Sequence, residues 1–167
     1  MTKECVRCML YKLFTPGTVV IELKSTEKYE AIRELIREAK VFQDLPDLDA
    51  FEQAVIQREE LQSTGLGHGV AFAHGRLPDV TALKVALGIS RKGIHFDSVD
   101  GKPVHLLFVF ATNPTMHIDY LSCLSSLAKM VKREGFREEI LACYEETEVT
   151  NKLCDTYWEV ACMGKAC

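Results

Sequence analysis

Two histidines, His74 and His117, stand where an imidazole could bind an anion or accept a group. His74 ends the apolar run 70–73 and precedes Gly75, so we expect it at the end of a buried strand, beside a loop. His117 falls in the first turn of a predicted helix, where free backbone N–H groups and the helix dipole favour an anion. A neutral imidazole is a competent nucleophile when its second ring nitrogen is fixed. The pair indicates a reactive or anion-binding site; the alternative is a set of ordinary surface and capping histidines.

Glycines cluster just before His74, at Gly65, Gly67 and Gly69. Such glycines let backbone N–H groups converge on an anion, because no Cβ stands in the way. The alternative is a pair of ordinary tight turns. The spacing is not a dinucleotide-binding fingerprint, since Val70 takes the place of the third glycine, and no Gly-Lys-Ser/Thr follows as in an ATP-binding loop. We therefore expect no nucleotide and no other cofactor.

Seven cysteines among 167 residues raise the question of disulfides or a metal. The N-terminus carries no secretory signal pattern, so we expect reduced thiols. Cys5-x-x-Cys8 has the spacing of a zinc or redox pair. A second half would have to come from Cys162 and Cys167, whose spacing is wider than that of a usual zinc knuckle. Scattered small hydrophobic residues are the simpler interpretation, and no metal site is predicted.

The composition limits the class of protein. Hydrophobic residues make up 47% and charged residues 26%, as in an ordinary globular domain. The 20 Lys and Arg against 24 Asp and Glu give a formal net charge of −4, without a basic excess for nucleic acid. The longest strongly apolar run, 106–111, is far shorter than the ~20 residues that cross a bilayer. We expect a cytoplasmic protein that binds no nucleic acid and does not insert into a membrane.

Strand and helix patterns alternate along the chain. Apolar and β-branched runs predict strands over 18–23, 70–73, 83–89 and 104–111, the last buried on both faces. Helical spacing of apolar residues predicts helices over 31–39, 47–60, 115–131, 136–144 and 146–160. The expected N-caps of the first three are Ser25, Asp47 or Asp49, and Thr115. We therefore predict an α/β fold: a single layered domain with a mixed β-sheet covered by helices on both faces.

Two stretches together carry a resemblance to a known family. Residues 58–74, REELQSTGLGHGVAFAH, resemble the pattern of fructose/mannitol-type (type-2) enzyme IIA domains of the phosphoenolpyruvate-dependent phosphotransferase system, PTS. That pattern runs R-E, then S-T-G-[IL]-G-x-G-[IV]-A-[IL]-P-H. Residues 93–131 are similar to the second half of that family, including a histidine that opens a long helix. The resemblance covers about 18–160, and free-standing domains of this length look most like the nitrogen-regulatory branch.

The resemblance implies a phosphoryl relay, with neither metal nor cofactor. It makes His74 the phosphoacceptor, which would take the phosphoryl group on Nε2 from the phosphohistidine of an HPr-type carrier. It makes His117 and Arg58 the residues that hold the phosphate oxygens. Phosphoryl transfer mainly requires such placement and charge stabilisation. The implied supporting groups are Ser63, Thr64, Gly67 and Gly69.

Several further expectations follow from the resemblance. It implies a IIA domain over 16–163, an N-terminal extension over 1–15 and a tail over 164–167. Ala73 stands where the family usually has Pro, which relaxes the backbone restraint before His74. The expected apolar docking face for HPr consists of Leu66, Val70, Phe72 and Leu77.

The step after His74 has two interpretations. The chain is a phosphohistidine phosphotransferase that passes the group to a IIB domain, or a regulatory module that binds target proteins according to its phosphorylation. A third interpretation keeps the fold and loses the chemistry, leaving a catalytically silent binding module. The intact set of Arg58, His74 and His117 favours an active carrier.

Overall fold

The computed structural model describes residues 12–163 of the chain. Within that range the strands form one five-stranded sheet of order β1-β4-β5-β3-β2. Pairs β1–β4 and β3–β5 are parallel, and pairs β4–β5 and β2–β3 are antiparallel, so the predicted mixed sheet is confirmed. The most apolar strand, β5, lies in the middle, as expected for a strand buried on both faces. The strands are β1 (Val19–Val20), β2 (Gly65–Gly67), β3 (Val70–Arg76), β4 (Lys84–Ile94) and β5 (Val104–Thr112).

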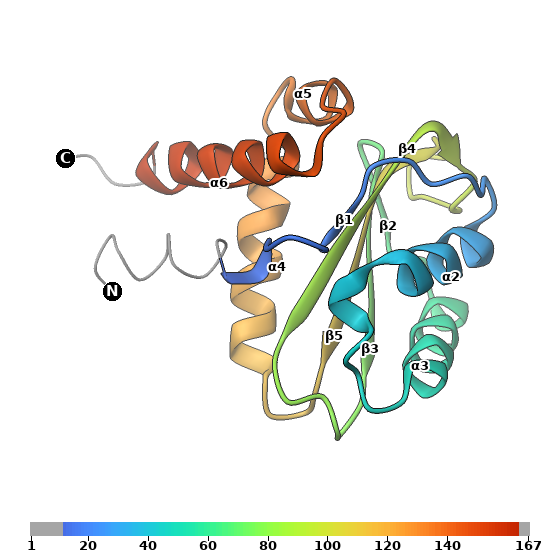
Figure 1. The fold of residues 1–167 in the computed structure, drawn as a ribbon. Coiled ribbons are helices and arrows are strands. Elements are labelled where there is room, and N and C mark those ends of the chain that lie inside the picture. The colour runs from blue at the N-terminus through green and yellow to red at the C-terminus, as the bar shows by residue number, and fades with distance from the viewer. Residues whose placement is uncertain (1–11, 164–167) are drawn as a thin grey trace.

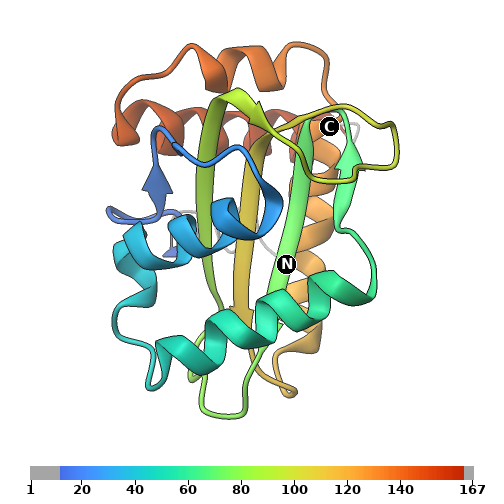
Figure 2. The same cartoon turned by 90° about the vertical axis from the view of Figure 1, so that its right-hand side faces the viewer.

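Helices cover both faces of the sheet (Figures 1 and 2). One face carries α2 (Lys28–Glu38), the short turn η1 (Lys40–Phe42) and α3 (Leu48–Leu61). The other side carries α4 (His117–Val131), α5 (Phe136–Leu141) and α6 (Glu146–Met163). Side chains that alternate along each strand account for the two layers. On β5, for example, Leu106 packs in the core next to α4, and the following Leu107 packs in the core next to α2 and α3.

The first two long helices begin at different kinds of residue. Asp47 caps α3 as predicted, since its carboxylate accepts the N–H of Ala50 at 2.8 Å. The expected cap of α2, Ser25, is wrong. Its backbone N–H donates to Glu34 at 2.8 Å, and the helix begins after Glu27 without a side-chain cap. The carboxylate of Glu34 thus reaches back and holds the segment that precedes α2 in extended form.

The second half of β3 has no strand on its outer side. The short β2 pairs only with the first two residues of β3. Beyond them, the N–H of Phe72 donates to the carbonyl oxygen of Thr64 at 3.2 Å. Amide groups along a strand alternate between its two edges, so the N–H groups of His74 and Arg76 point to this outer edge as well. Part of β3 is therefore an open edge of the sheet.

The cysteines of the described residues are not joined by disulfides. Cys123, Cys143 and Cys154 are buried thiols. Cys5, Cys8, Cys167 and the side chain of Cys162 lie outside the residues that the structure describes.

The start of the described chain contributes to the core. Phe14, which falls inside the expected extension over 1–15, is 3% exposed and packs edge-on against Phe108, with the ring centres 6.4 Å apart. Among residues 12–163, no helix combines the length and the hydropathy that a bilayer crossing needs.

Candidate functional site

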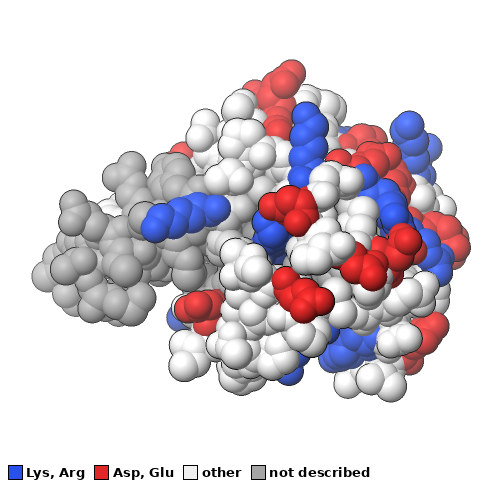
Figure 3. Space-filling model, turned by 60° about the horizontal axis from the view of Figure 1, so that its bottom comes forward, with Lys and Arg blue, Asp and Glu red and all other residues white. Residues whose placement is uncertain are grey.

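An open pocket of about 800 Å³ lies at the C-terminal end of β3. Strand β3 supplies His74 and Arg76, and the last turns of α3 supply the rest of the lining: Ala54, Gln57, Arg58, Glu60 and Leu61. Because β3 and β5 run parallel, this is also the end at which β5 leads into α4. Figure 3, in which this end comes forward, shows charges of both signs intermixed with uncharged surface.

His74 is half-buried against an aromatic wall. Its ring centre lies 5.4 Å from that of Tyr120 on α4, at an interplanar angle of 44°. Tyr120 in turn packs against Phe110, the neighbour of His74 on β5, at 5.4 Å and 76°. Strand β5 and helix α4 therefore hold one side of the imidazole, and the other side is open to the pocket.

The two ring nitrogens of His74 have different surroundings. Nδ1 is buried and has no hydrogen bond of full geometry, although the carbonyl group of Phe72 lies near enough to raise the pKa of the ring. Nε2, in contrast, is not a buried atom without a partner, and it makes no hydrogen bond to another described residue. Nε2 is therefore the nitrogen that can react with a group entering the pocket.

Electrostatics keep this imidazole neutral. Burial lowers the pKa of His74 below its ordinary value of 6.5, and the positive charges of Arg58 and Arg76 lower it further. A neutral ring carries the lone pair that a nucleophile needs. Burial also raises the pKa of Tyr120, so its hydroxyl stays protonated. A neutral nucleophile beside two guanidinium groups is suited to an anionic, electrophilic group such as a phosphoryl group.

The structure brings Arg58 and His74 into one pocket, as the sequence pattern indicated, and adds Arg76. The Nη1 group of Arg58 donates to the carbonyl oxygen of Gln62 at 3.1 Å, which holds the side chain along the end of α3. Arg76 was not predicted. Its spacing of two residues from His74 could have shown it, because such residues lie on the same side of a strand.

Ser63 and Thr64 are engaged away from the pocket. The N–H and the hydroxyl of Thr64 donate to the buried carboxylate of Glu59 at 2.9 and 2.5 Å. The hydroxyl of Ser63 donates to the carbonyl oxygen of Phe96 at 2.9 Å. Glu59 also pairs with Lys28, whose Nζ lies 3.3 Å from Oε1. In this structure the two hydroxyl groups fix the junction between α3 and β2.

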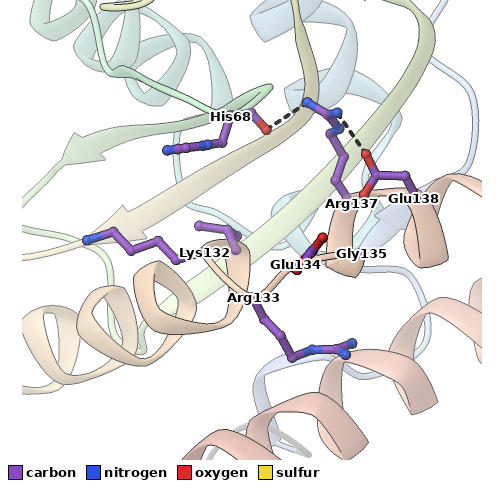
Figure 4. Close-up of a pocket in the computed structure, with 8 residues that line it drawn as sticks. His68, Lys132, Arg133, Glu134, Gly135, Arg137 and Glu138 are labelled. Carbon is purple, nitrogen blue, oxygen red and sulfur yellow. Dashed lines mark hydrogen bonds and ion pairs between the residues drawn. The ribbon is translucent and has the colours of Figure 1, made fainter.

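Gly67 and Gly69 lie at the opposite end of β3 from His74, in the turn between β2 and β3. Their φ angles are +87° and +74°, and a Cβ on Gly69 would stand 2.9 Å from Nη1 of Arg137. This turn borders a second pocket of about 410 Å³, lined among others by His68, Lys132 and Arg137 (Figure 4). The glycines serve a tight turn and a close approach of Arg137, and the structure does not bring them to His74.

His117 is the first residue of α4, as predicted. The expected N-cap of this helix, Thr115, is wrong. The helix begins after Met116, because the N–H and hydroxyl of Thr115 both donate to the side chain of Asn113, at 2.8 and 2.7 Å. The side chain of His117 is exposed and lies one helical turn before Tyr120. No contact among the described residues joins it to His74, so the structure places it at the same end of the sheet without a direct interaction.

Comparison with known proteins decides the family. The model of the family "Phosphoenolpyruvate-dependent sugar phosphotransferase system, EIIA 2" matches residues 12–155. The chain belongs to this family. Proteins of this PTS EIIA family act as phosphoryl carriers.

Individual relatives include both sugar-specific and regulatory proteins. The chain is 31% identical over 138 residues to the fructose-specific EIIABC component of Bacillus subtilis. This match spans 83% of this chain but only 22% of that relative. It is 31% identical over 134 residues to the nitrogen regulatory protein of Pseudomonas aeruginosa, covering 78% of this chain and 85% of that protein. The crystal structure of IIA-Ntr from Neisseria meningitidis superposes with a TM-score of 0.78 at 28% identity, over 87% of this chain and 99% of the other.

The expected docking face of this EIIA chain is wrong in part. Val70 and Phe72 are 1% and 5% exposed and pack in the core next to α4. Val70 and Phe72 point to the same side of β3 as His74. On that side, side chains of the core next to α4 cover these two residues, whereas His74 reaches the pocket. The exposed apolar side chains at this end are instead Leu61, 83% exposed, and Ile118, 81% exposed. Leu61 lines the pocket from α3, and Ile118 lies in the first turn of α4.

Proposed function

We propose that this EIIA chain accepts a phosphoryl group on Nε2 of His74 from the phosphohistidine of an HPr-type protein. The observation that supports this most is the neutral, half-buried imidazole whose Nδ1 is buried and whose Nε2 faces a pocket with Arg58 and Arg76. No cofactor is required, because transfer between two histidines exchanges like bonds. A donor charged from phosphoenolpyruvate is a cytoplasmic protein, so the same proposal places the chain in the cytoplasm.

The transfer step balances without another reactant. The lone pair of Nε2 forms a bond to phosphorus as the bond from phosphorus to the donor histidine breaks, and that electron pair returns to the donor ring. Nδ1 of His74 keeps its proton, near the carbonyl group of Phe72. Arg58 and Arg76 stabilise the charge on the phosphoryl oxygens. His117, at the N-terminus of α4, is the further group that we assign to these oxygens.

The use of the phosphoryl group follows one of two routes. The chain covers 85% of a nitrogen regulatory protein, which supports a free-standing regulatory carrier that contacts targets according to its phosphorylation state. The fructose-specific relative is named an EIIABC component, so its A part is accompanied by B and C parts. This likeness supports transfer from this chain to a separate IIB protein. The exposed Leu61 in the pocket and the exposed Ile118 at the start of α4 suit a protein partner on either route.

The test is phosphorylation by a purified relay. The protein is incubated with phosphoenolpyruvate, enzyme I and HPr, and intact mass spectrometry follows an acid-labile, alkali-stable phosphoryl group. We expect stoichiometric labelling of the wild type, none for His74→Ala, and normal labelling for His68→Ala, a histidine at the far end of β3. Full labelling of His74→Ala would remove His74 from the acceptor role. An unlabelled wild type beside active phospho-HPr would favour the silent binding module.

A second experiment tests the role of His117. If it holds the phosphoryl oxygens in the transition state, His117→Ala slows transfer and leaves the affinity for HPr nearly unchanged. Single-turnover rates at several HPr concentrations separate the two effects. Equal losses in rate and in affinity would place His117 in docking.

A further inference from the structure

Packing contributes to the orientation of the His74 ring. A histidine that reacts through one ring nitrogen is usually held by a hydrogen bond at the other. Here the carbonyl group of Phe72 lies near Nδ1, but the pair does not reach hydrogen-bond geometry. Among the described residues, the aromatic ring that contacts this imidazole is that of Tyr120, with ring centres 5.4 Å apart.

Tyr120 is itself firmly held. It is 6% exposed and packs edge-on against Phe110, which belongs to the core next to α4. Its hydroxyl makes no hydrogen bond to another described residue. The apolar face of the ring is therefore the part of Tyr120 through which it acts on its neighbours.

We propose that Tyr120 is a positioning residue for His74: its aromatic ring holds the imidazole so that Nε2 faces the pocket and Nδ1 stays buried. The role rests on the proposed function of His74 as phosphoacceptor. Tyr120 lies within the predicted helix 115–131, among its apolar residues, and outside the R-E and S-T-G-[IL]-G-x-G-[IV]-A-[IL]-P-H pattern of the family.

Tyr120 also keeps water from the imidazole. Burial is the largest cause of the lowered pKa of His74. The charged groups that face this ring are Arg58 and Glu59 from α3 and Arg76 from β3, and a substitution at Tyr120 leaves them in place. On α4, the buried Cys123 thiol, with a pKa raised to about 12, stays neutral, and His117 lies exposed one turn away. Replacing the ring with a smaller side chain should therefore raise the pKa of His74 toward its ordinary value.

Three variants separate the ring from the hydroxyl and from the general core. Tyr120→Phe removes only the hydroxyl, and Tyr120→Leu removes the ring. Tyr157→Leu makes the same change at a site on α6 that is 8% exposed and belongs to the same core. Single-turnover transfer from phospho-HPr gives rate and affinity, and ¹⁵N NMR of the imidazole gives the tautomer and pKa of His74 without any phosphoryl transfer.

We expect Tyr120→Leu to lower the transfer rate by about tenfold or more, with the affinity for phospho-HPr nearly unchanged. The pKa of His74 should rise in this variant, and its Nδ1–H tautomer should become mixed. Tyr120→Phe and Tyr157→Leu should match the wild type in rate and in imidazole spectrum. If Tyr120→Leu does not fold, Tyr120→Met, which better preserves the volume, takes its place.

Three outcomes overturn the role of Tyr120. One is a wild-type rate and spectrum for Tyr120→Leu, another is a Tyr120→Phe variant as slow as Tyr120→Leu, and the third is an equal loss in Tyr157→Leu. A wild type that phospho-HPr does not label, or a labelled His74→Ala, would instead overturn the proposed function. The spectrum of the unphosphorylated imidazole would still show whether Tyr120 orients the ring.

Discussion

At His74, burial and the positive charges of Arg58 and Arg76 all disfavour the protonated form of the ring. They lower the pKa of the ring below 6.5, so the reactive neutral form persists at mildly acid pH. We expect the rate of phosphoryl acceptance to stay level as the pH falls through about 6.5 and to drop only below it. Arg76→Gln removes one positive charge and should move the midpoint of this drop to higher pH. Single-turnover rates, paired with an NMR titration of His74 itself, check both statements; a wild-type midpoint above the ordinary histidine value contradicts them.

The lowered pKa of His74 also makes the stability of the fold depend on pH. Because the folded-state pKa of His74 is depressed, its neutral form stabilises the fold above the unfolded value near 6.5. That contribution is lost as the pH falls toward the folded value, where the buried ring must take up a proton.

Arg76 offers a clean test of anion binding. Its side chain is exposed and makes no hydrogen bond or ion pair with another residue in the range 12–163. Arg76→Ala should therefore change the free energy of unfolding by less than about 0.5 kcal/mol. If its guanidinium stabilises the phosphoryl oxygens, the same variant slows transfer by roughly a hundredfold, and Arg76→Lys recovers part of the loss. Denaturant unfolding and single-turnover labelling are the two measurements, and an unchanged rate would exclude Arg76 from the step.

The sequence identified part of this site and missed the rest for a physical reason. His74 and Arg58 could be found because their spacing follows a family pattern, and the structure places both in one pocket. Tyr120 could not, since an aromatic residue at helical spacing looks the same whether it packs on a core leucine or on a reactive imidazole. Gly67 and Gly69 drew attention by composition, yet the strand between them and His74 carries them to the other end of the sheet.

Among the elements, the end of α3 is tied to the start of α2 by a buried ion pair. Lys28 and Glu59 are 8% and 2% exposed, with Nζ and Oε1 3.3 Å apart. Lys28→Met should lower the free energy of unfolding by about 3–5 kcal/mol, because it leaves the carboxylate buried without its cation. Adding Glu59→Gln should recover part of this loss.

Denaturant unfolding measures these differences, with an exposed pair as control. Glu30→Gln breaks the pair with Arg33, whose side chains are 61% and 44% exposed, and should cost less than about 1 kcal/mol. A loss for Lys28→Met no larger than that of the control would show that the Lys28–Glu59 pair is not effectively buried.

Element boundaries departed from the sequence patterns where pairing overrides local preference. β2, Gly65–Gly67, has no β-branched residue and was not expected; it forms because β3 offers a partner. β4 continues to Ile94, past the polar residues 90–92 where the apolar run ends. β1 is only two residues long, although the β-branched run is longer, because the regular parallel ladder with β4 spans only Val19 and Val20; beyond it, the N–H of Leu23 donates to the carbonyl oxygen of Ile89 at 2.7 Å.

At the scale of the molecule, one sheet separates two cores that must fold together. Leu106 and Leu107 are fully buried neighbours on β5 that face opposite cores. Leu106→Ala and Leu107→Ala should each lower the free energy of unfolding by about 2–5 kcal/mol. Unfolding should stay a single transition by near-ultraviolet and far-ultraviolet circular dichroism alike. A biphasic curve in either variant would show that one layer unfolds without the other.

The layered α/β class could be predicted from the alternation of elements, but the strand order could not. The order β1-β4-β5-β3-β2 depends on which strands pair at long range, and the runs at 83–89 and 104–111 look alike as apolar segments. Their antiparallel pairing, and the parallel pairing of β3 with β5, determine that His74 and the start of α4 meet at one end.

The open edge of β3 divides neighbouring amides into two populations that deuterium can distinguish. Toward β5 the N–H groups of Ala73 and Gly75 lie inside the sheet, and toward the outer edge those of His74 and Arg76 have no strand to bind. Exchange with heavy water should therefore alternate along four consecutive residues, fast at His74 and Arg76 and slow at Ala73 and Gly75. A protein partner that seats on this edge would erase the alternation, which makes these four amides a built-in reporter of the complex.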